Sequence, residues 1–230
     1  MGGSAEETVY EQNLADGSAP NAAALTQTGS FAVSAVDGLN TVVIGGVTVV
    51  SGGVLTGTLT VDTALGLLTV TGFTPVTGAG GEVIGGTVAY SYLLQDNSLA
   101  HTQAGADGGV FDNFAVVVTD TDGSNNNAVL NVEVIDDVPA ALPDVDSVTE
   151  DGPLVANGNV LTAAAVASPD ANSTDGVADV RGADGAVVSA VAFDTTPNAV
   201  GGLVTRRLWA RRAERTSKLE QIGRASCRER

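Results

Sequence analysis

Residues 111–139, which read FDNFAVVVTDTDGSNNNAVLNVEVIDDVP, decide how this chain folds. Apolar residues alternate with their neighbours over 114–118 and again over 130–134, and this period of two predicts two half-buried strands. The segment DTDGS at 120–124 is polar and contains a Gly, which adopts a positive φ at little cost. It therefore predicts a turn. The stretch therefore predicts a hairpin that closes a domain.

The second run leads into IDDVP at 135–139, where two adjacent carboxylates stand directly before a proline. Pro139 cannot donate a ladder hydrogen bond, so sheet pairing is expected to end there. The segment 138–151 that follows is rich in proline and acidic residues, and we interpret it as a linker. We therefore expect the first domain to end at Asp137 and a second β-rich unit to follow the linker.

Short apolar runs bounded by Gly-containing turns also precede the hairpin. They predict further strands at 8–11, 31–36, 41–44, 47–50, 54–61, 67–71 and 87–95. The segment 13–27 is rich in turn residues, and no part of 1–205 has a sustained 3.6-residue period with caps, so we expect no helix there. About ten strands within residues 7–137 predict an all-β fold, an antiparallel β-sandwich, behind a polar lead-in at 1–6.

Charge is distributed unevenly along the chain. Residues 1–205 contain 24 acidic residues and one basic residue, Arg181, whereas residues 206–230 contain nine basic and three acidic residues. Carboxylates without Lys or Arg partners repel one another within a Debye length of about 8 Å, and divalent cations would relieve that repulsion. Such a surface is a poor partner for nucleic acid, so we expect no nucleic-acid binding. No apolar run reaches membrane-spanning length, and we expect no membrane insertion.

The composition changes abruptly at residue 206. The segment 206–230 holds the only Trp, the only Lys and the only Cys of the chain. Its last ten residues, QIGRASCRER at 221–230, resemble the translation of a common short-read sequencing adapter. We interpret 206–230 as a non-native tail and assign no function to it.

The segment 152–205 contains about 55 residues, which is too few for a second complete sandwich. Within it, residues 158–161 and the alternating segment 186–193 predict strands. We therefore expect a partial second β-repeat. The N-terminus lacks a basic region followed by an apolar run, and we expect no N-terminal secretory signal there.

Calcium binds six to eight oxygen ligands and favours acidic side chains that loops gather at one end of a sandwich. Six carboxylates lie within sixteen positions of the junction: Asp136, Asp137, Asp144, Asp146, Glu150 and Asp151. A solvated acidic linker is the alternative, but the scarcity of Lys and Arg favours a bound cation. The pair Asp120 and Asp122 at the hairpin tip is a second candidate, although acidic residues are ordinary in turns. A third candidate set is Asp170, Asp175, Asp179 and Asp184.

Catalytic motifs are absent from the sequence. It contains neither a Gly-x-Ser-x-Gly nucleophile elbow nor a His-Glu-x-x-His pair, and paired carboxylates arise by chance in so acidic a chain. EF-hand spacing and glycine-rich nonapeptide calcium repeats are absent as well. The only histidine, His101, lies in the loop 96–109, where we expect it to be solvated and without a metal or catalytic role. We expect no enzymatic activity.

Five segments together carry a resemblance to a known family. They are VYEQNLADGS at 9–18, FDNFAVVVTDTDGS at 111–124, VEVIDDVPAALPDVDSVTE at 132–150, GNVLT at 158–162 and DGVADVRGADGAVVSAVAF at 175–193. Residues 6–205 thereby resemble the tandem repeat domains of very large bacterial adhesins exported by type I secretion. These adhesins are grouped with the RTX adhesins, and their repeats are related to cadherin-like and bacterial immunoglobulin-like modules.

The resemblance implies an immunoglobulin/cadherin-like fold and a structural role without catalysis. Such repeats fold outside the cell when Ca²⁺ binds at their junctions, and they extend an adhesive domain from the bacterial surface in cell adhesion and biofilm formation. The implied protein is secreted to the cell surface, its cofactor is Ca²⁺ and its partners are neighbouring repeats of the same chain. The implied ligands are Asp136 and Asp137, with further candidates Asp120, Asp122, Asp144, Asp146 and Glu150.

Two other functions stay open at this point. A carbohydrate- or ligand-binding module would need an exposed aromatic platform, and residues 1–205 contain only three Tyr and five Phe. An accessory β-domain of a secreted hydrolase would place catalytic motifs elsewhere in a longer protein. Additional copies of the IDDVP-type junction in flanking sequence would favour the adhesin repeat instead.

Overall fold

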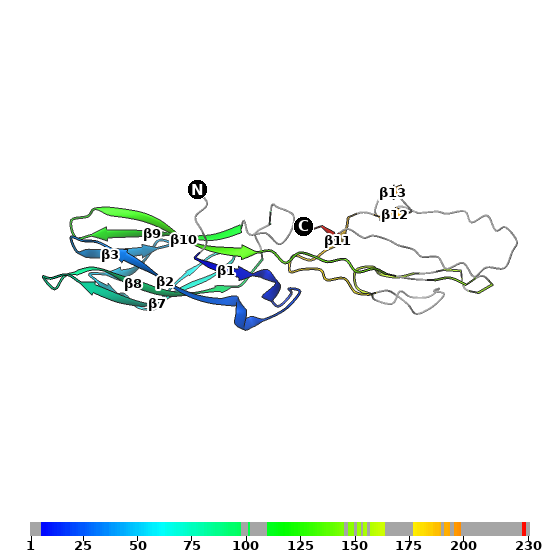
Figure 1. The fold of residues 1–230 in the computed structure, drawn as a ribbon, viewed down its shortest axis with the longest axis horizontal. Coiled ribbons are helices and arrows are strands. Elements are labelled where there is room, and N and C mark those ends of the chain that lie inside the picture. The colour runs from blue at the N-terminus through cyan, green and yellow to red at the C-terminus, as the bar shows by residue number, and fades with distance from the viewer. Residues whose placement is uncertain are drawn as a thin grey trace. The chain divides into compact units, whose positions relative to one another are not determined.

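The computed structural model describes residues 6–97, 101, 110–144, 147–149, 151–152, 154–155, 157–163, 177–189, 191–193, 196–198 and 227–228. The chain divides into two compact units, Met1–Asp137 and Val138–Arg230 (Figure 1). No helix in the described part of the chain is long and apolar enough to cross a membrane.

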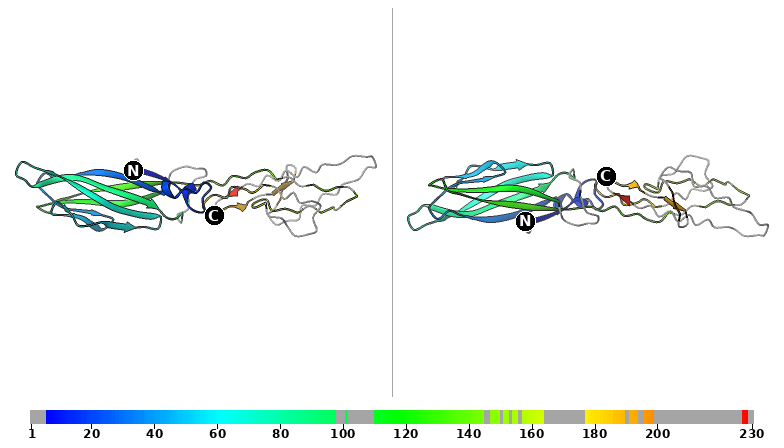
Figure 2. Two further views of the ribbon diagram at one scale, coloured as in Figure 1. Left: turned by 90° about the horizontal axis from the view of Figure 1, so that it is seen from below. Right: turned by 90° about the horizontal axis from the view of Figure 1, so that it is seen from above.

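The first unit is an all-β sandwich with immunoglobulin-like strand order, which confirms the predicted fold class. A six-stranded sheet has the order β1-β10-β9-β3-β4-β5 and faces a four-stranded sheet with the order β2-β8-β7-β6 (Figures 1 and 2). The strands are β1 (Glu7–Tyr10), β2 (Thr26–Ser34), β3 (Leu39–Ile44), β4 (Val47–Ser51), β5 (Val54–Leu55), β6 (Leu59–Asp62), β7 (Gly66–Thr77), β8 (Val83–Leu94), β9 (Val110–Asp120) and β10 (Asn125–Ile135). Neighbouring strands pair antiparallel, except that β1 pairs parallel with β10.

The β9–β10 hairpin is longer than the sequence pattern predicts. Its register runs from Thr119↔Asn125 to Val110↔Val134, so the polar run at 125–127 belongs to the strand rather than to the turn. Backbone pairing is indifferent to side-chain polarity on an exposed face, and residues 125–129 are all exposed. Gly123 has φ 95° in the four-residue connection, which is the left-handed conformation that the turn requires.

Two aromatic rings from opposite sheets pack together in the core. Phe114 of β9 is 1% exposed, and its ring meets that of Tyr92 of β8 edge to face at a centroid distance of 6.1 Å. The Tyr92 hydroxyl donates a hydrogen bond to Asp112 Oδ2 at 2.9 Å, and the Thr63 hydroxyl donates to the same oxygen at 2.6 Å. Because these hydrogen bonds pair the Tyr92 hydroxyl with Asp112 Oδ2, the core can bury a phenol and a carboxylate together.

Tyr92 makes the fold sensitive to alkaline pH. Burial, followed by the charge of Asp112, raises the pKa of the Tyr92 phenol well above its ordinary value. The unfolded chain releases this proton above pH about 10 while the folded chain retains it, so stability falls as pH rises beyond that point, by about 1.4 kcal/mol per pH unit. Tyr92→Phe should cost about 1 kcal/mol at pH 8 through the lost hydrogen bond and flatten this decline in urea unfolding. An unchanged alkaline slope would contradict the assignment.

Two details of the first unit correct the sequence predictions. The single strand expected at 54–61 is divided into β5 and β6, which belong to different sheets, because Gly57 at φ 140° breaks the run between them. No helix was expected, but two short 3-10 helices occur, η1 (Glu11–Asn13) and η2 (Ala22–Leu25). Each is a single turn in the connection between β1 and β2, too short to leave a 3.6-residue period in the sequence.

The second unit has short described elements only. They are β11 (Val187–Val188), β12 (Val191–Phe193), β13 (Thr196–Asn198) and β14 (Cys227–Arg228), with β11 paired to β14 and β12 paired to β13. The strand expected at 158–161 is not formed, and Val160–Thr162 makes a turn in which Asn159 Oδ1 accepts the Leu161 N–H at 3.0 Å. An Asn that accepts from the backbone two residues on favours a turn over a strand.

Candidate metal centre

Parallel pairing places two carboxylates side by side at one end of the first unit. Tyr10, the last residue of β1, pairs with Ile135, the last residue of β10. Both strands run in the same direction, so Glu11 and Asp136 leave the sheet next to each other. Glu11 is 0% exposed and Asp136 is 4% exposed. The fold therefore buries two acidic side chains at the point where the first unit ends.

Asp136 is the more unusual of the two. Neither of its carboxylate oxygens has a hydrogen-bond partner within the described part of the chain. A buried ionised carboxylate is strongly disfavoured unless a donor, a counter-charge or a metal compensates it. Residues 1–137 contain 15 acidic residues and no Lys or Arg, so His101 is the only basic side chain that the unit's own sequence supplies. The surroundings of Asp136 fit a cation.

His101 completes the cluster. Its Nε2 lies 3.3 Å from Glu11 Oε1, and the two side chains are 2% and 1% exposed. One donor atom each from Glu11, His101 and Asp136 lie within 4.8 Å of one another. The expectation that His101 is solvated is therefore wrong, because its side chain is enclosed against η1. The centre offers two carboxylates and one imidazole nitrogen to an ion.

Asp137, unlike Asp136, has hydrogen-bond partners in the described residues. It is 6% exposed, and both of its oxygens accept hydrogen bonds from Ser18, at 2.6 Å from the backbone N–H and 2.5 Å from the hydroxyl. Gly17 permits this approach, since a Cβ there would lie 2.5 Å from the Gln12 carbonyl oxygen. The two hydrogen bonds thus connect the loop after η1 to the residue that follows the end of β10 by two positions.

The remaining junction carboxylates follow Asp137 in the chain and belong to the second unit. Asp144 belongs to the second unit, where its Oδ1 accepts the Val177 N–H at 2.7 Å. Asp146 and Glu150 lie outside the described residues. In the third candidate set, Asp179 Oδ1 accepts the Leu142 N–H at 2.7 Å, so this carboxylate also serves backbone pairing inside the second unit.

The hairpin-tip pair lies at the other end of β10, about 35 Å of strand away from Asp136. Asp120, Asp122 and Asp37 place one carboxylate oxygen each within 4.8 Å of one another. A hydrogen bond shared with Asp122 raises the pKa of the Asp120 carboxyl, and the Ser124 hydroxyl lowers the pKa of Asp122. Asp37 and Asp122 are exposed, and backbone N–H groups already satisfy Asp120 and Asp122, so this cluster is also an ordinary polar turn.

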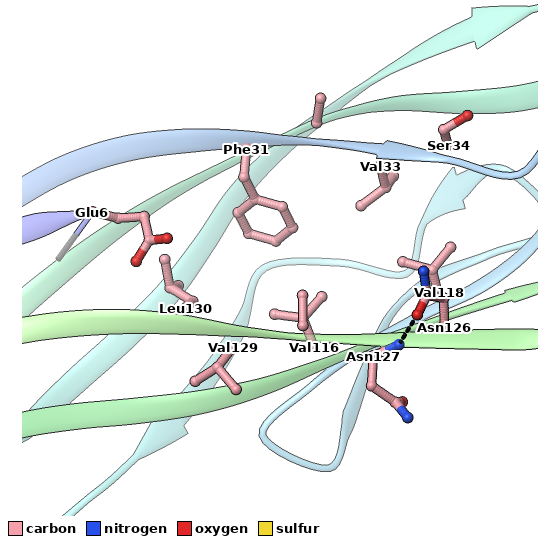
Figure 3. Close-up of a pocket in the computed structure, with 12 residues that line it drawn as sticks. Glu6, Phe31, Val33, Ser34, Val116, Val118, Asn126, Asn127, Val129 and Leu130 are labelled. Carbon is pink, nitrogen blue, oxygen red and sulfur yellow. Dashed lines mark hydrogen bonds between the residues drawn. The ribbon is translucent and has the colours of Figure 1, made fainter. Parts of the chain in front are cut away.

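An open groove of about 370 Å³ lies between β2 and the β9–β10 hairpin (Figure 3). Phe31 and Val33 of β2 lie opposite Val116 of β9 and Leu130 of β10, while Glu6 borders one end. Among the residues that the structure describes, Phe31 is the only aromatic residue that lines it. Within the described lining, the groove presents one aromatic ring, whereas a carbohydrate-binding module would present an aromatic platform.

Sequence reasoning named Asp136 but missed Glu11, His101 and Asp37. Glu11 could have been found from its position, since it directly follows a short strand just as Asp136 directly follows a longer one. Only the parallel register of β1 and β10, however, shows that the two residues are neighbours. No sequence pattern connected His101 to this cluster, because it is 35 positions from Asp136 and 90 from Glu11. Searches against protein-family profiles, curated proteins and solved structures give no match.

Proposed function

We propose that the first unit is a calcium-stabilised structural repeat, an extender domain of a secreted bacterial surface adhesin without catalytic activity. The observation that carries the proposal is the Asp136 carboxylate, 4% exposed and without hydrogen-bond partners in the described residues, beside the buried Glu11. Two such groups repel each other, and a divalent cation between them turns the repulsion into attraction. Ca²⁺ would take carboxylate oxygens from Glu11 and Asp136.

The position of these ligands suits a mechanical role. A cation held by Glu11 and Asp136 ties the end of β1 to the end of β10, where the chain leaves the first unit after Asp137. The segment where the chain leaves the first unit is then stiffened only when the ion is bound. This coupling is what an extender repeat needs in order to hold its neighbour along a rod.

The charge of the chain suits calcium-dependent folding outside the cell. Carboxylates without basic partners repel one another, so a low-calcium cytosol would keep the chain loose for type I secretion. Extracellular calcium modules bind with dissociation constants of about 10⁻⁴–10⁻³ M, a range that millimolar external calcium matches. The absence of Cys from residues 1–205 also removes any need for oxidative folding. The RTX-group adhesin repeat is therefore the assignment that we propose.

A calcium titration tests this proposal. At about 100-fold excess over its dissociation constant, Ca²⁺ should stabilise the protein by about 2.7 kcal/mol, seen as a higher melting temperature and a smaller hydrodynamic radius. Mg²⁺ should do much less, because it demands near-octahedral geometry and keeps its waters. The matched control is Asp16→Asn, an exposed acidic residue of the same connection, which should respond like wild type. If Ca²⁺ changes neither quantity, the extender proposal fails.

A further inference from the structure

We propose that the Glu11–His101–Asp136 cluster is also a site for a zinc-class transition-metal dication, with His101 Nε2 as a direct ligand, and that such a metal competes there with calcium. The inference takes from the proposed function only that this cluster holds a cation. It differs in assigning a nitrogen ligand and a second class of ion. Three observations carry it: the spacing of the donor atoms, their chemistry and their burial.

The spacing fits a tetrahedral ion. Glu11 Oε1 and His101 Nε2 are 3.3 Å apart. Two atoms at this separation can both lie about 2.1 Å from one Zn²⁺, with an angle of about 105° at the metal, close to tetrahedral. One ligand atom each from Glu11, His101 and Asp136 lie within 4.8 Å of one another, so a small closure brings in Asp136 as a third ligand. Contraction onto the ion would relieve the unpartnered Asp136 carboxylate directly.

The donor atoms of this cluster suit a transition metal better than they suit calcium. Calcium needs six to eight oxygens, whereas this cluster brings together three side chains, one of which is an imidazole. Imidazole and carboxylate together suit Zn²⁺, which needs four ligands and accepts a water as the fourth. Calcium would have to complete its shell with backbone carbonyls and waters. Zn²⁺ needs only one water in addition to the three side chains of the cluster.

Burial distinguishes this cluster from the acidic turn at the hairpin tip. The side chains of Glu11 and His101 are 1% and 2% exposed, and Asp136 is 4% exposed. Water competes poorly for such donors, and the unpartnered Asp136 carboxylate lies among them. The exposed Asp37–Asp120–Asp122 cluster has no comparable buried group. We therefore expect a preference for metals that bind imidazole nitrogen at the buried centre and not at the hairpin tip.

The single histidine of the chain makes the test direct. In nitrogen-15 NMR at neutral pH, all imidazole signals report on His101, and Zn²⁺ should shift its Nε2 resonance at stoichiometric addition. Co²⁺ in place of Zn²⁺ should give visible ligand-field absorption. Cys227→Ser is the background for every sample, because the lone thiol would otherwise bind either metal. In calorimetry, saturating Zn²⁺ should weaken the apparent calcium affinity at least about tenfold.

The matched variant is His101→Gln, which keeps a polar side chain but removes the imidazole. It should lose zinc affinity by at least about tenfold, since even residues behind a metal ligand contribute that much. The calcium midpoint of the same variant should move much less, because Glu11 and Asp136 are retained. If His101→Gln does not fold, the wild-type Nε2 shift decides the question by itself.

The outcomes separate the two proposals. If calcium stabilises the protein and Zn²⁺ leaves the His101 resonances unchanged, the zinc inference is overturned while the extender proposal stands. If Zn²⁺ shifts Nε2 and calcium has no effect, the reverse holds. Equal zinc affinity in wild type and His101→Gln would also overturn the assignment of His101 as a ligand.

Discussion

Asp136→Asn is expected to stabilise the protein in the absence of divalent cations and to abolish its stabilisation by calcium. In the cation-free state the variant replaces a buried carboxylate without hydrogen-bond partners in the described residues by a neutral amide, which can donate to Glu11. Removing that charge should raise the free energy of unfolding by about 1–3 kcal/mol. In saturating calcium the same change removes a ligand and about 2.7 kcal/mol of linked stability. Calcium should therefore offset the advantage of the variant, and it inverts the stability order wherever that advantage is below about 2.7 kcal/mol.

Urea unfolding with a chelator, and again in about 10 mM Ca²⁺, measures both halves of this prediction. Asp16→Asn makes the same chemical change at an exposed site and should leave both values within about 0.5 kcal/mol of wild type. A destabilised Asp136→Asn protein under chelator would mean that the carboxylate is compensated without any metal. That result would remove the main support for the metal centre.

Phe114→Ala is expected to destabilise the first unit by about 3–5 kcal/mol, which is typical for truncation of a buried aromatic ring. Phe114 is 1% exposed and packs edge to face against Tyr92 across the two sheets, so its removal leaves a cavity between them. Domains of this size are stable by only about 5–15 kcal/mol. The variant should therefore lose a large share of its stability and depend on calcium to remain folded.

Denaturant unfolding at fixed calcium concentration measures this loss. Val129→Ala on the neighbouring strand β10 is the control, because Val129 is 50% exposed and its truncation should cost at most about 0.5 kcal/mol. A loss below about 1 kcal/mol for Phe114→Ala would show that the two sheets are not held together at this contact. The assignment of Phe114 to the centre of the core would then be wrong.

Much of the first unit can be predicted from local pattern. Phe114 and Val116 alternate with exposed residues in β9, and Leu130 and Val132 alternate with half-buried residues in β10, as the period of two predicts. The reason is that strand periodicity records which face is buried, and burial of apolar side chains is the dominant favourable term in folding. The scarcity of Lys and Arg likewise followed from the sequence, and with it the expectation of a cation.

Pairing partners could not be predicted in the same way. The run at 54–61 reads as one strand, yet β5 and β6 belong to different sheets. The polar run at 125–127 reads as turn, yet it pairs with β9. Alternation marks a face but carries no information about which strand lies alongside, because backbone hydrogen bonds are the same for every residue.

The sequence by itself determined that this protein is an acidic all-β chain and that Asp136 and Asp137 stand at the end of its principal hairpin. Only the tertiary structure decided that these two carboxylates differ in role, one accepting hydrogen bonds from Ser18 and the other lying with Glu11 and His101. The parallel register of β1 on β10 brings together residues 125 positions apart. Such contacts depend on how the whole chain closes its sheets, and no local pattern of residues encodes that closure.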